Sequence, residues 1–146
     1  MKQIKFLGLM LMTAMAVVFT SCTDMQRLKM EVKASNVGLP EDIGDGMIMT
    51  KIQLHGDYVE YIIEWNEIDE DGEEFSVAEL NDPETKELMK QFFIESIKKP
   101  ESKEDADDIA DLLELLKPCR VGMGFRLTGK QTGGECTIRI EYWELP

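Results

Sequence analysis

The run of acidic residues over 64–74, EWNEIDEDGEE, is the first segment of this chain whose side chains could do chemistry. Calcium is bound by oxygen ligands at alternate positions around a glycine turn. Glu67, Asp69 and Asp71, with Gly72 after them, can be aligned with positions 1, 3, 5 and 6 of a twelve-residue calcium loop. These three acids are therefore the candidate calcium ligands.

The rest of this loop fits calcium poorly. Position 12 holds Ala78 where a bidentate Glu is needed, and position 1 holds Glu67 where Asp is usual. The element before the loop is predicted to be a strand, whereas a calcium loop follows a helix. The preferred interpretation is a solvated acidic loop that leaves a strand and protects its edge from aggregation.

Few other residues could act in catalysis or bind a metal. His55 is the only histidine, and neither Cys119 nor Cys136 lies in a spacing typical of a zinc site. A dyad of His55 with Cys119 would need a thiol of low pKa and a third group to orient it, and the sequence indicates neither. We therefore predict no catalytic residue, no metal site and no cofactor.

Aromatic and apolar side chains on an exposed sheet could instead bind a sugar or a peptide. Tyr58 and Ile62 are predicted to lie on the face of the sheet that points away from the helices, and Trp143 ends the last hairpin. These three residues form a candidate ligand face. The alternative is that Trp143 covers Gly122 and Gly124, as an aromatic side chain can do beside a glycine-rich strand.

The elements that would position these residues begin with a hairpin. Residues 47–55 and 58–66 are predicted strands joined by the two-residue turn Gly56–Asp57, which has glycine first as a type II′ turn prefers. In this register one face of the hairpin is almost wholly apolar. The predicted pairs are His55 with Tyr58, Leu54 with Val59, Ile52 with Tyr61, Thr50 with Ile63, and Ile48 with Trp65.

Two amphipathic helices are predicted next. Asp82 can cap the first, and Pro83 suits its first position because the missing N–H has no partner there. Ser102 can cap the second, which ends before Pro118. The residues expected to be buried are Leu88, Met89, Phe92, Phe93 and Ile97 in the first helix, and Ala106, Ile109, Leu112, Leu113 and Leu116 in the second.

A second hairpin is predicted at the end of the chain, with strands over 121–127 and 136–143 around a glycine-rich turn. The predicted pairs are Leu127 with Cys136, Phe125 with Ile138, and Met123 with Ile140. This register puts Cys119 and Cys136 about 26 Å apart at ~3.3 Å per residue. A disulfide tolerates Cα atoms only up to about 7 Å apart, so both thiols are expected to stay free.

Together these elements predict an α+β fold. Each hairpin has one apolar face and each helix one apolar stripe, and neither can be buried without the other. We therefore expect a two-layer sandwich of a four-stranded antiparallel sheet and two helices, in the order ββααββ.

The first 22 residues, MKQIKFLGLMLMTAMAVVFTSC, predict export. Lys2 and Lys5 flank the start of an apolar run of about 14 residues, which is shorter than the ~20 needed to span a bilayer. Thr20, Ser21 and Cys22 resemble the lipobox of bacterial lipoproteins. The resemblance implies that Cys22 is diacylated and becomes the mature N-terminus, and two acyl chains suffice for stable anchoring to a membrane.

The expected organisation is a signal peptide over 1–21, a lipidated tether over 22–36 and a single α+β domain over 37–146. The residues after Cys22 match neither the lipoprotein pattern for inner-membrane retention nor the one for surface display. By this resemblance we expect the outer membrane, with the domain facing the periplasm. Surface display remains an open alternative.

The charge of the mature chain narrows the choice of partner. Residues 1–21 hold two of the 16 basic residues and none of the 29 acidic ones, so the remainder carries a formal charge of −15. Such a domain repels phosphates, and we expect no binding to nucleic acid or to lipid through a basic patch. We predict a lipid-anchored envelope protein that binds or scaffolds an unknown protein, peptide or glycan. The alternative is an envelope hydrolase or other enzyme that uses the acids of Glu67–Glu74.

Overall fold

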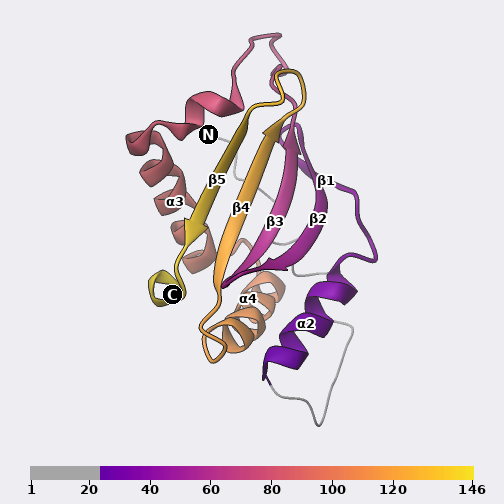
Figure 1. The fold of residues 1–146 in the computed structure, drawn as a ribbon, viewed down its shortest axis with the longest axis vertical. Helices are drawn as coiled ribbons and strands as arrows, with labels where there is room; N and C mark the ends of the chain where they lie inside the picture. The colour runs from indigo at the N-terminus through magenta and orange to yellow at the C-terminus, as the bar shows by residue number, and fades with distance from the viewer. Residues whose placement is uncertain (1–23) are drawn as a thin grey trace.

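A computed structural model describes residues 24–146, so the signal peptide and Cys22 lie outside the described part of the chain (Figure 1). Within residues 24–146, no helix is both long and apolar enough to cross a membrane. The elements in chain order are α2 (Asp24–Ser35), β1 (Glu41–Gly44), β2 (Met47–His55), β3 (Tyr58–Trp65), the 3₁₀ helix η2 (Val77–Asn81), α3 (Pro83–Lys98), α4 (Lys103–Leu116), β4 (Gly122–Gly129), β5 (Glu135–Ile140) and the 3₁₀ helix η3 (Tyr142–Glu144).

The sheet has five strands in the order β1-β2-β3-β4-β5, and β3 and β4 run parallel at its centre while the other neighbours are antiparallel. The prediction of a four-stranded antiparallel sheet in the order ββααββ is therefore wrong. The reason is the connection between the hairpins. Two helices carry the chain from the end of β3 back to the end where β3 began, so β4 starts beside Tyr58 and runs in the same direction (Figure 1).

Two elements of the fold come from the segment before the first hairpin. Strand β1 pairs with the first residues of β2, and α2 packs against β2 and α4. The segment expected to be a tether thus forms a helix, and its Leu28 is only 1% exposed. Its buried apolar residues are too few to produce a recognisable helical period in the sequence.

The predicted register of the first hairpin is confirmed near the turn and wrong beyond it. His55, Leu54 and Ile52 pair as expected, but a bulge at Thr50 shifts the remaining pairs by one residue. Met49 therefore faces Ile63, and Met47 faces Trp65. The physical gain is that two apolar methionines are buried while the hydroxyl of Thr50 stays exposed.

The predicted register of the last hairpin is confirmed throughout. Leu127 lies opposite Cys136, and the two predicted pairs further along the strands also form. Cys136 is buried and Cys119 is half-buried, and both are free thiols. Burial raises the pKa of both thiols above its ordinary value.

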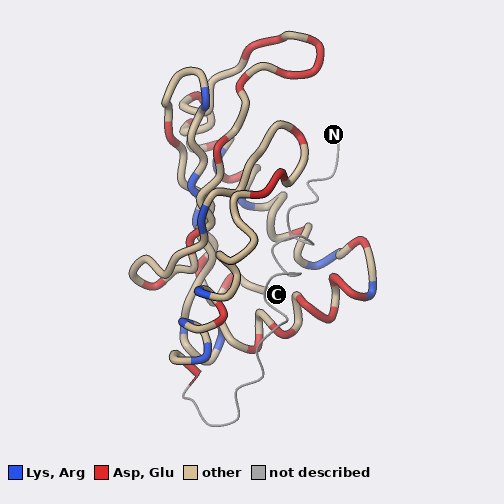
Figure 2. The backbone as a smooth tube through the Cα atoms, turned by 90° about the vertical axis from the view of Figure 1, so that its right-hand side faces the viewer, with Lys and Arg blue, Asp and Glu red and all other residues tan. Residues whose placement is uncertain are grey.

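Helices α3 and α4 lie on one face of the sheet and leave the other open, while α2 packs against β2 and α4 at the lower end (Figures 1 and 2). Phe93 of α3 stacks on Phe125 of β4, with ring centroids 4.3 Å apart. The predicted caps are confirmed, because Asp82 accepts from the N–H of Thr85 and Ser102 from that of Asp105.

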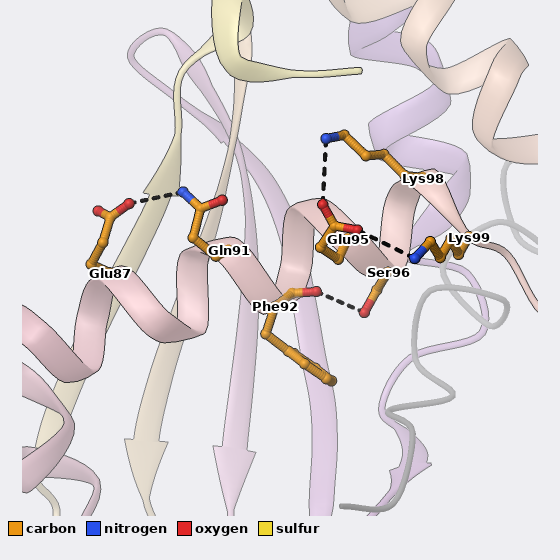
Figure 3. Close-up of polar contacts among 7 residues, drawn as sticks. All are labelled: Glu87, Gln91, Phe92, Glu95, Ser96, Lys98 and Lys99. Carbon is orange, nitrogen blue, oxygen red and sulfur yellow. Dashed lines mark hydrogen bonds and ion pairs between the residues drawn. The ribbon is translucent and has the colours of Figure 1, made fainter.

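The predicted buried stripe of α3 is partly wrong. Leu88 is 66% exposed, and Ile94 is buried in its place. Apart from Leu88, the outer surface of α3 is polar, with Gln91 donating to Glu87 and Glu95 paired with Lys98 and Lys99 (Figure 3).

Candidate functional site

Glu67, the first residue of the proposed calcium loop, points into the protein. It is 1% exposed, and its carboxylate accepts hydrogen bonds from the backbone N–H groups of Val77, Gln131 and Thr132 at 2.8–3.1 Å. The hydroxyl of Thr132 donates to it at 2.8 Å. Glu67 therefore ties together the acidic loop after β3, the start of η2 and the β4–β5 turn.

The electrostatics of Glu67 follow from these contacts. Burial raises the pKa of its carboxyl, but the hydrogen bonds from Thr132, Val77 and Gln131 outweigh burial and hold the pKa below its ordinary value. The charged carboxylate is consequently the form that the fold stabilises. Gly129 is required beside it, since a Cβ atom there would lie 2.3 Å from the Cδ atom of Glu67.

The other two candidate calcium ligands do not converge with Glu67. Asp69 uses its Oδ1 atom to accept from the N–H groups of Asp71 and Glu73, at 2.9 and 2.8 Å, and so shapes its own loop. Asp71 is exposed. Within residues 24–146, no three acidic, histidine or cysteine side chains are grouped as a metal site.

Tyr58 and Ile62 are half-buried and alternate along β3 with Tyr61, which stacks on Phe125 on the side of the sheet that faces α3, so they belong to the opposite face. The hydroxyl of Tyr58 donates a hydrogen bond to Glu141, and the guanidinium of Arg139 lies 5.1 Å from the centre of its ring. The hydrogen bond to Glu141, followed by burial, raises the pKa of Tyr58. This part of the face is therefore fixed by contacts between β3 and the end of β5.

Trp143 lies apart from the strand positions of this face. It belongs to η3, is 68% exposed, and meets the ring of Tyr142 edge-on with centroids 5.1 Å apart. Tyr58, rather than Trp143, covers the glycine-rich strand, because a Cβ atom at Gly122 would lie 3.1 Å from the Tyr58 ring.

Sequence reasoning missed Glu60, a buried carboxylate on the same face. It is 3% exposed and accepts a hydrogen bond from Gln53 at 3.0 Å. Gly124 lies beside it, and a Cβ atom built on the glycine would be in ordinary contact with the Cγ atom of Glu60, at 3.7 Å. Its burial could have been predicted from the sequence, because Glu60 lies between apolar residues on a central strand.

Two further carboxylates in the helical layer also escaped the sequence analysis. Asp108 of α4 is 5% exposed, and its Oδ2 atom has no hydrogen-bond partner within residues 24–146. Burial, followed by the charges of Glu104, Asp111, Asp105 and Asp107, raises the pKa of Asp108. Glu31 of α2 similarly has a buried Oε2 atom without a partner in the described chain, and burial raises its pKa despite the charge of Arg27.

Comparison with solved structures identifies proteins of the same fold. A protein of Pseudomonas aeruginosa that is thought to be secreted superposes with a TM-score of 0.54 at 15% identity, covering 86% of this chain and 98% of its own. The type II secretion system pilotin AspS of Vibrio cholerae gives a TM-score of 0.51 at 12% identity, covering 83% and 94%. The corresponding pilotin EpsS of Vibrio vulnificus gives 0.49 at 10% identity.

No known protein family matches the sequence, and no curated protein matches it either. The five-stranded sheet with its helical layer is therefore a fold that this chain shares with a pilotin and with a protein thought to be secreted, at low sequence identity.

Proposed function

We propose that this chain is a lipid-anchored protein of the bacterial cell envelope that acts as a non-catalytic binding or scaffolding module. The observation that carries the proposal is the fold shared with the pilotin AspS along nearly the whole length of both chains. The lipobox-like end of the signal peptide at Cys22 supports the same compartment independently of the fold. The anchor is proposed to sit in the outer membrane, with the domain facing the periplasm.

The proposed partner is another protein of the envelope, such as a component of a secretion or assembly machine. AspS, which shares this fold, is a pilotin of a type II secretion system. The formal charge of −15 favours a neutral or basic partner surface.

The arrangement of the acidic loop favours a binding role for the protein over the alternative of a hydrolase. Glu67 is engaged in four hydrogen bonds inside the fold. The acids at 69–71 and 73–74 are all exposed on a loop that projects from the upper end of the sheet (Figure 1). A hydrolase would instead place a pair of carboxylates around a bound substrate.

Acylation is tested by replacing Cys22. Cells that make the Cys22→Ala protein should incorporate no radiolabelled fatty acid into it and should leave it unprocessed or mislocalised. Cys119→Ala is the matched control and should be labelled like the unaltered protein. Equal labelling of the Cys22→Ala protein would refute the lipid anchor.

The partner is tested by capture from solubilised envelope with the acylated protein as bait. An envelope protein that is retained by the unaltered chain and displaced by an excess of the same chain without its tag supports the proposal. Turnover of a peptide or glycan substrate that is lost in a Glu70→Gln/Asp71→Gln protein would support the hydrolase and contradict a purely binding role.

A further inference from the structure

The outward face of α2 has a composition unlike the rest of this acidic chain. At about 100° per residue, positions 25, 29, 30 and 33 fall within one arc of the helix. They are Met25, Lys29, Met30 and Lys33, all exposed, with the two methionines 38% and 36% exposed. Leu28 points the opposite way and is buried. This face, called here the Met/Lys face, carries two apolar side chains and two cations, and no acid.

More cations lie at the same end of the molecule. Helix α2 packs against α4, which leads into the connection to β4. That connection holds the exposed Lys117 and Arg120. Figure 2 shows basic positions gathered around α2 at the lower end of the molecule, beside the acidic helix α4, and an acidic loop at the upper end. The charge of −15 is therefore distributed unevenly. The expectation of no lipid binding through a basic patch rested on the net charge alone, and the Met/Lys face is a local exception to it.

The Met/Lys face lies close in the chain to Cys22, the proposed site of the lipid anchor. Only one residue separates Asp24, the start of α2, from Cys22. Two residue steps span at most about 7 Å. A diacylated Cys22, which is part of the function proposed above, would therefore hold the first turn of α2 at the level of the lipid headgroups.

We infer that the Met/Lys face of α2 rests on the phospholipid bilayer, with Lys29 and Lys33 on lipid phosphates and Met25 and Met30 at the headgroup boundary. Long lysine side chains can cover apolar surface while their ammonium groups reach the phosphates. The acidic loop at the other end of the sheet then points away from the anionic surface. The membrane thus orients the domain, and the upper end is presented to partners.

Depth-dependent quenching tests this orientation in the acylated full-length protein. A fluorophore is attached at Met30→Cys or at Asp71→Cys in a Cys119→Ser background. Each protein is reconstituted in vesicles of phosphatidylcholine and phosphatidylglycerol that contain a headgroup-linked nitroxide. Quenching should be strong at position 30 and nearly absent at position 71.

Reversing the charge of the two lysines is a second test of the proposed orientation. Lys29→Glu/Lys33→Glu should lower the ratio of docked to undocked molecules, measured by quenching at position 30, by about fivefold for each lysine. Lys98→Glu/Lys99→Glu makes the same charge change at the end of α3, where both lysines are exposed, and should leave the quenching unchanged (Figure 3). Thermal unfolding of both proteins verifies that they fold.

The two proposals fail in different ways. Unaltered protein that floats with the vesicles but shows equal quenching at positions 30 and 71 would overturn the orientation and leave the anchor standing. Protein that does not float with the vesicles at all would overturn both the anchor and the orientation. Equal loss of quenching in the two charge-reversed proteins would show a general effect of net charge and would also overturn the role of the Met/Lys face.

Discussion

The side chain of Asn36 pairs with the backbone of Ile52 as a neighbouring strand would. Its Nδ2 atom donates to the carbonyl of Ile52 at 2.6 Å, and its Oδ1 atom accepts from the N–H of Ile52 at 2.9 Å. Strand β1 covers only the first residues of β2, so Ile52 would otherwise have an open edge. The carboxamide closes that edge and fixes the end of α2 to the sheet.

At the opposite edge of the sheet, an asparagine side chain again forms a hydrogen bond with the backbone of a strand. Asn81, at the end of η2, donates from Nδ2 to the carbonyl of Glu135 at 2.7 Å, at the start of β5. An asparagine carboxamide thus pairs with the part of β2 beyond β1 on one side of the sheet, and with the first residue of β5 on the other. Both edges are protected from pairing with other chains by residues that lie outside the strands.

Replacing Asn36 should destabilise the protein. Asn36→Ala removes both bonds to Ile52 and leaves its backbone groups without a protein partner, which should lower the free energy of unfolding by about 1–3 kcal/mol. Urea denaturation measures this change. Lys33→Ala, on the exposed side of the neighbouring helix, should stay within about 0.5 kcal/mol of the unaltered protein. Similar losses in the two proteins would contradict a role for the Asn36 carboxamide.

Glu67→Gln should destabilise the protein in a way that depends on pH. The pKa of Glu67 is lower in the fold than its ordinary value of 4.5. Its stabilising contribution is therefore complete above pH 4.5 and is lost as the pH falls through the lower folded pKa. The difference in melting temperature between the two proteins should be large at pH 7 and should shrink below pH 4.5. Glu73→Gln, in the exposed part of the loop, should show no such trend, and a difference independent of pH would refute the argument.

Asp108→Asn should stabilise the protein at neutral pH. The pKa of Asp108 is raised above 3.8 in the fold, so the charged form is the unfavourable one. The contribution of Asp108 to stability is therefore greatest below pH 3.8 and falls as the pH rises through its folded pKa. The gain in melting temperature from Asp108→Asn should therefore be present at pH 7 and absent at low pH. Glu114→Gln removes one exposed charge from the same helix, and an equal gain there would mean that net charge is the cause.

The two glycines of β4 on the open face should respond differently to alanine. A Cβ atom at Gly122 would lie 2.3 Å from the carbonyl oxygen of Ile140, whereas one at Gly124 would find its nearest neighbour at 3.7 Å. Gly122→Ala should therefore lower the free energy of unfolding by about 1–3 kcal/mol through overpacking. Gly124→Ala should be close to neutral in the same urea titration. Equal effects would show that strand flexibility, and not the contact with Ile140, governs both positions.

Where the physical cause was local, the sequence alone determined the structure. The caps at Asp82 and Ser102 depend on one side chain and an N–H three residues later. The turn at Gly56–Asp57 sets the first pairs of its hairpin, and the alternation around Cys136 sets the last. Each of these features is decided by residues that are neighbours in the chain.

The tertiary structure decided the features that join distant residues. The parallel pairing of β3 with β4 depends on where two intervening helices deliver the chain, and the bulge at Thr50 depends on which side chains the core can bury. Glu67 looked like a calcium ligand in the sequence, but its partners at Gln131 and Thr132 lie more than sixty residues later in the chain. Only folding brings these donors to the carboxylate, because hydrogen-bond partners are selected by proximity in space and the sequence records only proximity along the chain.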